Sequence, residues 1–119
     1  MKWYRDLYVG ESIRHKEKKI RWKIRHCAGM LSVYVLSVPE QSGNLLELIP
    51  SRELLQRGYP TGGLFIVGIA GNYEEAQEVA GHIISQVYRD TGDVDVHAYF
   101  DRKQQSRRSG RGKTVTWGS

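Results

Sequence analysis

The spacing of apolar residues predicts a buried strand followed by a long amphipathic helix. Residues 64–70 are apolar on both faces of a strand, which is typical of the centre of a sheet. A helix is expected over residues 73–90, with Asn72 as its N-cap. Glu75 occupies the capping-box position, and Gly92 follows the last turn. The apolar residues of this helix recur at 3.6-residue spacing: Ala76, Val79, Ala80, Ile83, Ile84, Val87 and Tyr88.

Alternation with a period of two predicts further strands. Within residues 19–25, apolar side chains alternate with basic ones: Ile20, Trp22 and Ile24 with Arg21, Lys23 and Arg25. A helix would leave Trp22 on the charged side, so a strand accounts for more of these residues. A tight turn would pair this strand with the apolar residues 30–38 in a hairpin. Residues 94–100 alternate in the same way and are expected to form the last strand.

Together these elements predict one α+β domain over residues 1–100. It would contain a small mixed or antiparallel sheet, with the long helix and one or two short helices on one face. A short strand at residues 3–9 and a short helix between Ser51 and Gly58 complete the expected elements. Residues 101–119 are rich in Arg, Ser, Gly and Gln, and we expect them to form a disordered basic tail.

Charge divides the 119 residues into three blocks. Residues 1–26 carry a net charge of +6, residues 27–100 carry −6, and residues 101–119 carry +5, which gives +5 for the chain. A basic arm, an acidic body and a basic tail indicate either an anionic ligand or charge pairing with a partner.

Motifs that would indicate catalysis or a cofactor are missing from the sequence. Cys27 is the one cysteine, which excludes an intramolecular disulfide and a thiolate zinc site. The turn at residues 68–72 matches neither the dinucleotide fingerprint nor the P-loop, and Glu74 and Glu75 would repel a phosphate there. The apolar runs fall short of the roughly 20 residues that span a bilayer, and residues 1–6 lack the features of a signal peptide. We therefore expect a cytoplasmic, non-enzymatic protein with no cofactor, no metal and no membrane partner.

The basic residues of the predicted strand 19–25 are the first candidate binding site. Arg21, Lys23 and Arg25 would share one face at intervals of about 6.6 Å, which suits contacts to a nucleic-acid backbone. The tail adds six further cations: Arg102, Lys103, Arg107, Arg108, Arg111 and Lys113. The same charges also fit a solvated sheet face, a protected edge strand, a solubilising terminus, or a tail that folds back on the acidic body.

Four aromatic residues lie among the basic residues of the N-terminal block, namely Trp3, Tyr4, Tyr8 and Trp22. A platform for base stacking requires such neighbours. A small sheet buries the same residue types, and Trp22 belongs to the apolar side of its predicted strand. We therefore expect these rings to pack in the core.

Two classes of function fit these observations. The first is a non-enzymatic nucleic-acid-binding or nucleoprotein-associated domain, in which the basic strand positions the ligand and the basic tail tethers it. The second is a protein–protein adaptor or self-associating module, in which the acidic body meets a basic arm and an exposed sheet edge supports pairing.

Two segments carry a resemblance to other proteins. They are residues 3–12 (WYRDLYVGES) and the Gly-Ile-Ala of residues 68–70 leading into Tyr-Glu-Glu-Ala at residues 73–76. In these segments the chain resembles short uncharacterised proteins of Gram-positive bacteria. The resemblance implies a bacterial cytoplasmic origin, and it carries no activity, cofactor or site residue with it.

Overall fold

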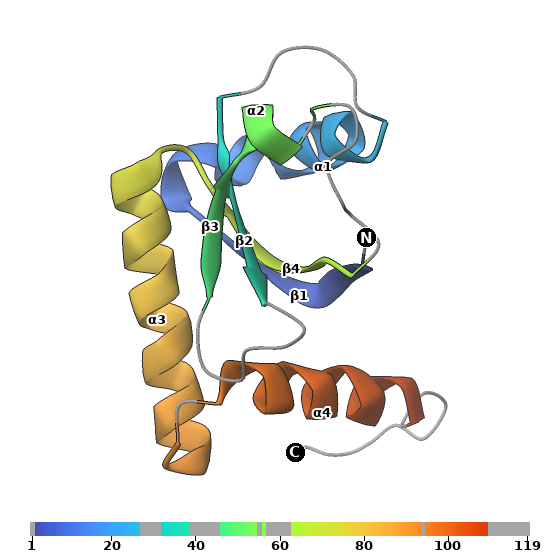
Figure 1. The fold of residues 1–119 in the computed structure, drawn as a ribbon, viewed down its shortest axis with the longest axis vertical. Coiled ribbons are helices and arrows are strands. Elements are labelled where there is room, and N and C mark those ends of the chain that lie inside the picture. The colour runs from blue at the N-terminus through green and yellow to red at the C-terminus, as the bar shows by residue number, and fades with distance from the viewer. Residues whose placement is uncertain are drawn as a thin grey trace.

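The computed structural model describes residues 2–26, 32–38, 46–54, 56, 63–93 and 95–109, with the backbone alone for His97 and residues 104–109. Its elements follow in chain order (Figure 1): β1 (Lys2–Val9), the 3₁₀ helix η1 (Glu11–Lys16), α1 (Glu17–Arg25), β2 (Tyr34–Val38), β3 (Glu47–Pro50), α2 (Ser51–Leu54), β4 (Phe65–Ala70), α3 (Tyr73–Thr91) and α4 (Val96–Ser109). Within these ranges, no helix combines the length and the apolar character that a membrane crossing requires.

The four strands form one mixed sheet in the order β1-β4-β2-β3. β1 runs parallel to β4, whereas β2 runs antiparallel to both of its neighbours. All six residues of β4 are buried, so the predicted central strand is confirmed. The short strand near the N-terminus and the short helix beginning at Ser51 are also present. β1 and β3 are therefore the two edges of the sheet.

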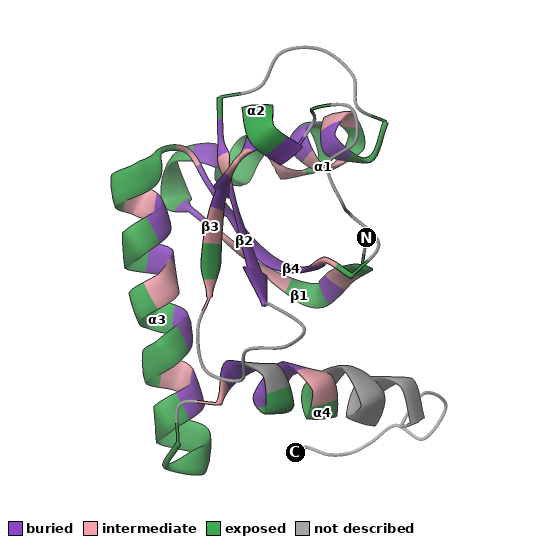
Figure 2. Cartoon of the chain, in the orientation of Figure 1, coloured by how far each residue is buried: buried purple, intermediate pink, exposed green. Residues whose placement is uncertain are grey.

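Helices cover both faces of the sheet, and β4 contributes side chains to both, with a register shift against β2 between Ile66 and Gly68. Phe65 and Val67 belong to a core shared with α3 and α4. Ile66 and Ile69 belong to a second core shared with η1, α1 and α2. Figure 2 shows the result as buried central strands and a long helix that is buried only on its inner side. The predicted α+β class with a small mixed sheet and one long helix is confirmed, with helices on two faces where one was expected.

Both ends of α3 are capped as the sequence predicts. The side-chain oxygen of Asn72 accepts a hydrogen bond of 2.8 Å from the backbone N–H of Glu75. Gly92 follows the helix with a φ of 75°, a left-handed conformation that favours glycine, and its N–H donates to the carbonyl of Tyr88 at 2.7 Å. These caps explain why the predicted boundaries of this helix agree with the structure.

The strand expected over residues 19–25 is wrong, because this segment lies in helix α1. Ile20 and Ile24, four residues apart, are buried on one side of the helix and anchor it to the second core. Trp22 points away from them and is 55% exposed, so the expectation that it packs in the core is also wrong. The hairpin built on that strand is wrong as well, since β2 pairs with β3 and β4 instead.

The last predicted strand, at residues 94–100, is wrong for a similar reason. The backbone from Val96 to Ser109 is the helix α4, and the carboxylate of Asp95 accepts a hydrogen bond from the N–H of Ala98 at its first turn. Val96, Tyr99 and Phe100 are buried at helical spacing. The domain boundary expected at residue 100 therefore falls inside a helix, and residues 101–109 are helical rather than a disordered tail.

A tyrosine side chain joins α4 to α3. The hydroxyl of Tyr99 donates to a carboxylate oxygen of Asp90 at 2.5 Å. Burial raises the pKa of Tyr99 above its usual range, and the Asp90 charge raises it further. Tyr99 therefore keeps its proton and remains a donor to Asp90.

Candidate nucleic-acid interface

The start of η1 is hydrogen-bonded to a carboxylate of α3, the helix on the opposite face of the sheet. Glu75, in the first turn of α3, accepts hydrogen bonds from the backbone N–H of Ser12 at 3.0 Å and from its hydroxyl at 2.8 Å. It also accepts the N–H of Gly71 at 2.7 Å. Gly10 approaches this carboxylate so closely that a Cβ there would displace it. Glu75 therefore connects the start of η1 to α3 through these hydrogen bonds. Its capping-box position in the sequence did not predict this role.

Removing the charge of Glu75 should destabilise the fold, because its hydrogen bonds to Ser12 and Gly71 would be weakened. The N–H of Ser12, then the N–H of Gly71 and the Ser12 hydroxyl, hold the pKa of Glu75 below its ordinary value of 4.5. Because the pKa is lowered in the folded state, the stabilisation is present above pH 4.5 and is lost as the pH falls through the lowered value. We expect Glu75→Gln to lower the free energy of unfolding by about 1–2 kcal/mol at neutral pH, measured by urea denaturation.

The neighbouring carboxylate gives the matched control for this variant. Glu74→Gln removes the same charge from the same helical turn but breaks none of the hydrogen bonds described above, so it should change stability by less than about 0.5 kcal/mol. The difference between the two variants should shrink as the pH falls through the lowered pKa of Glu75, where its carboxylate becomes protonated. Equal effects of both variants at neutral pH would show that these hydrogen bonds contribute nothing.

The side chains around α1 divide into a buried apolar side, an exposed side opposite to it, which we call the crown, and two basic sides between them, which we call the flanks. At 100° per residue, Trp22 lies opposite the buried pair Ile20 and Ile24, so it forms the crown. One flank carries Lys18, Arg21 and Arg25, and the other carries Lys16, Lys19 and Lys23. The basic residues therefore surround an exposed aromatic ring rather than form one row.

The crown is a stacked pair of rings. The rings of Trp22 and His26 lie 4.3 Å apart at an interplanar angle of 25°. The Nδ1 of His26 lies 2.8 Å from the carbonyl oxygen of Trp22, to which it can donate, and this hydrogen bond orients the imidazole at the end of α1. His26 covers one side of the indole, and the exposed fraction of Trp22 shows that solvent reaches the rest.

Arg21, Lys23 and Arg25, which the sequence placed on one strand, are divided between the two flanks of α1. The guanidinium groups of Arg21 and Arg25 lie 5.3 and 5.8 Å from the ring centre of Trp3 on β1, which is within cation–π range. Arg21 also forms an ion pair of 3.1 Å with Glu17. Lys23 lies on the other flank, where it lines a cavity with Lys16 and Lys19. The predicted continuous row of Arg21, Lys23 and Arg25 therefore does not exist.

The two tail cations whose side chains the structure describes lie on the other side of the sheet from α1. Arg102 and Lys103 belong to α4, on the opposite face of the sheet, and Figure 1 shows α1 and α4 on opposite sides of the molecule. Residues 107 and 108 also belong to α4, although the side chains of Arg107 and Arg108 are outside the described part. Arg111 and Lys113 lie outside the described residues altogether. The described cations of the predicted site therefore lie on two separate helices, α1 and α4.

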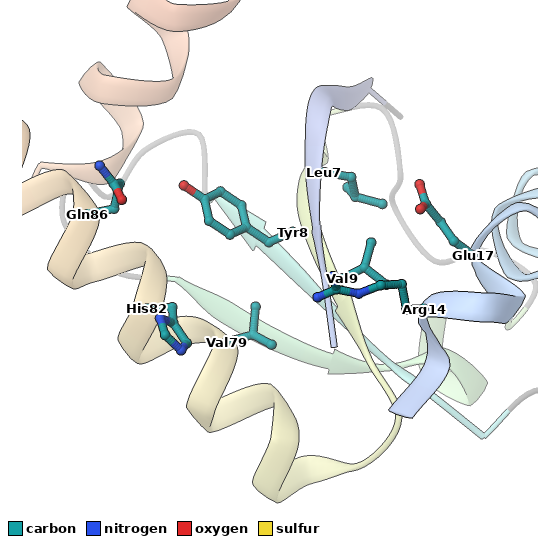
Figure 3. Close-up of a pocket in the computed structure, with 8 residues that line it drawn as sticks. All are labelled: Leu7, Tyr8, Val9, Arg14, Glu17, Val79, His82 and Gln86. Atoms are coloured by element: carbon teal, nitrogen blue, oxygen red, sulfur yellow. The ribbon is translucent and has the colours of Figure 1, made fainter. Parts of the chain in front are cut away.

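A second concavity follows the free edge of β1 (Figure 3). It has a volume of about 480 Å³ and lies between η1 and α1 on one side and α3 on the other. Leu7, Tyr8 and Val9 form its floor, with Arg14, Glu17, Val79, His82 and Gln86 around it. Its lining mixes apolar groups with charges of both signs, unlike the basic surface of α1.

Two further kinds of site, a phosphate site at the turn after β4 and a metal site, can be compared with the described residues. The N–H of Gly71, which a phosphate at the β4–α3 turn would need, is occupied by Glu75. Over the residues that the structure describes, no group of three or more His, Cys, Asp or Glu side chains could hold a metal ion. Comparisons with protein-family models, curated proteins and solved structures found no match to this chain.

Proposed function

We propose that this domain binds single-stranded nucleic acid, without catalysis, through the exposed side of α1. The observation that supports the proposal is the half-exposed indole of Trp22, placed between two flanks of basic side chains on one short helix. An exposed indole offers a flat apolar face, and unpaired bases stack on such rings.

The two parts of this surface have separate tasks. Stacking on Trp22 favours unpaired bases, because the bases of a duplex are already stacked on one another. The flanking cations contact phosphates and release counterions, which gives affinity with little sequence preference. The proposed ligand is therefore a short unpaired stretch of DNA or RNA.

Salt dependence tests this proposal on the unmodified chain. Fluorescence anisotropy with labelled single-stranded and duplex oligonucleotides should show binding that weakens steeply between about 50 and 200 mM salt. The single-stranded forms should bind more tightly than duplexes of the same sequence. Absence of binding at the lowest salt, or a clear preference for duplex, would contradict the proposal.

A second candidate function is that of a protein adaptor, and the groove along β1 supports it. The N–H of Gly10 donates to Ile69 of β4 at 2.8 Å. Because N–H groups alternate in direction along a strand, the N–H of Val9 faces away from β4, towards the free edge. An extended segment of a partner protein could add to β1 at this point. Between Trp3 and Tyr8, however, β1 advances by five residues while β4 advances by two. Such a bulge makes that part of β1 a poorer partner for an added strand.

The adaptor function predicts a distinct mutational result. Val9→Pro removes a donor of the free edge and leaves the hydrogen bond of Gly10 to β4 intact. Peptides selected from a random library on the domain should lose binding to Val9→Pro but keep binding to Trp22→Ala. The reverse pattern, or failure to select any peptide, would contradict an adaptor role for this edge.

A further inference from the structure

Beside the crown of α1 lies a cavity in which all the charged residues of the described lining are lysines. It has a volume of about 370 Å³ and lies between η1, α1, the residues before β2 and the end of β4. Lys16, Lys19 and Lys23 line it, together with Ser12, Ser32 and Gly71 and the apolar Ile13, Ile20 and Val33. Lys19 and Lys23 are four residues apart on one flank of α1, and Lys16, the last residue of η1, lies on the same side of the cavity.

The gathering of these lysines is unfavourable without a counter-charge. Like charges three and four residues apart on a helix repel one another. Among the described residues, none of the three lysines forms an ion pair, whereas Arg21 on the other flank is paired with Glu17. No carboxylate of the described residues lines the cavity. An anion held between the ammonium groups would remove this repulsion.

Glu75 is the acidic group nearest to this lining, and its contacts limit what the cavity can bind. Its carboxylate contacts Ser12 and Gly71, and those hydrogen bonds use the Ser12 hydroxyl proton and the Gly71 N–H. Neither donor remains for a ligand. The three ammonium groups and the hydroxyl of Ser32 are the donors left, so recognition depends on charge rather than on a cradle of backbone amides.

We propose that this cavity is a binding site for a terminal phosphate, that is, a phosphate monoester. A monoester carries a charge of about −1.5 to −2 at pH 7, whereas an internal phosphodiester carries about −1, so three lysines match the monoester better. Lys19 and Trp22 are three residues apart and adjacent on the helix surface. A strand whose end phosphate occupies the cavity therefore has its first bases beside the indole. The assignment of the phosphate to a nucleic-acid end rests on the proposed function, whereas the anion site itself does not.

Oligonucleotides that differ only in a 5′-phosphate or a 3′-phosphate test the proposal. With the intact chain, one phosphorylated form should bind roughly tenfold more tightly than its hydroxyl counterpart, the effect of about one charge-assisted hydrogen bond. Lys19→Gln should abolish this preference. Lys18→Gln is the matched control, because it removes the same charge from the other flank and should weaken both forms equally.

Thermal unfolding in the presence of inorganic phosphate, at constant ionic strength, tests whether the cavity binds free phosphate. Together with the oligonucleotide experiment, it shows whether the ligand is a free phosphate or the phosphate at the end of a nucleic-acid strand. Phosphate-dependent stabilisation that disappears in Lys19→Gln but not in Lys18→Gln supports the anion site even if no oligonucleotide binds, and the proposed function then fails alone. Oligonucleotide binding without any preference for a terminal phosphate overturns the inference and leaves the proposed function intact. If neither phosphate nor oligonucleotide binds, both are overturned.

Discussion

Phe100→Ala is expected to lower the free energy of unfolding by about 3–5 kcal/mol, which is a large part of the stability of a small domain. Phe100 is fully buried at the start of α4. Its ring makes edge contacts with Tyr4 at 4.7 Å, Tyr99 at 5.2 Å and Tyr8 at 6.1 Å between ring centres. Truncation removes these contacts and leaves a cavity between α4 and the sheet.

Urea denaturation followed by circular dichroism measures this effect. Tyr88→Ala is the control, because Tyr88 is 60% exposed on α3 and its truncation should change stability by less than about 0.5 kcal/mol. Phe100→Leu, which keeps an apolar group in the site, should cost less than Phe100→Ala. Similar stabilities for Phe100→Ala and Tyr88→Ala would show that α4 does not pack against the sheet.

This experiment also bears on why the sequence predicted α3 and not α4. In α3 the apolar stripe runs from Ala76 to Tyr88, between an asparagine N-cap and a glycine C-cap, so several independent signals agree. Among the side chains of α4 that the structure describes, the buried ones are Val96, Tyr99 and Phe100, and the helix continues as a basic segment. Val96 and Ala98 fit a period of two as well, and the N-cap role of Asp95 was the signal that could have decided the matter.

Helix α1 was missed through a single assumption about tryptophan. Two isoleucines four residues apart fit both a strand and a helix, so the position of Trp22 decided between them. Burial of a large aromatic ring is the ordinary expectation in a small sheet, and it selected the strand. The structure instead exposes that ring, and in doing so reveals the surface on which the proposed function depends.

The arrangement of the candidate site could not be predicted from the sequence. Binding cations were expected on a basic strand and in the basic tail, and Arg21, Lys23 and Arg25 lie on one helix instead. The change from strand to helix moved Lys23 away from both arginines and brought it to Lys16 and Lys19, which were not among the predicted site residues. No pattern in the sequence links these lysines to Ser32 and Gly71, because the cavity depends on how β2 and β4 pack beside α1.

Trp22→Ala should weaken binding of single-stranded oligonucleotides by about 1–3 kcal/mol, which is roughly 5- to 150-fold, if one base stacks on the indole. The exposed ring contributes little to the core, so stability should change by less than about 0.5 kcal/mol. Trp22→Tyr should restore much of the affinity, because a smaller aromatic ring still stacks. Tyr88→Ala, which removes another exposed aromatic ring from the opposite face, should leave binding unchanged.

The salt dependence of these variants separates stacking from charge on the same helix. An indole releases no counterions, so Trp22→Ala should weaken binding without changing the slope of log Kd against log salt. Lys18→Gln should lower that slope by about 0.7, the value for one phosphate contact on a single strand. If Trp22→Ala changed the slope and not the affinity extrapolated to high salt, the ring would act only by positioning its basic neighbours. A loss of affinity at constant slope would mean that the exposed crown of α1 contacts the bases themselves.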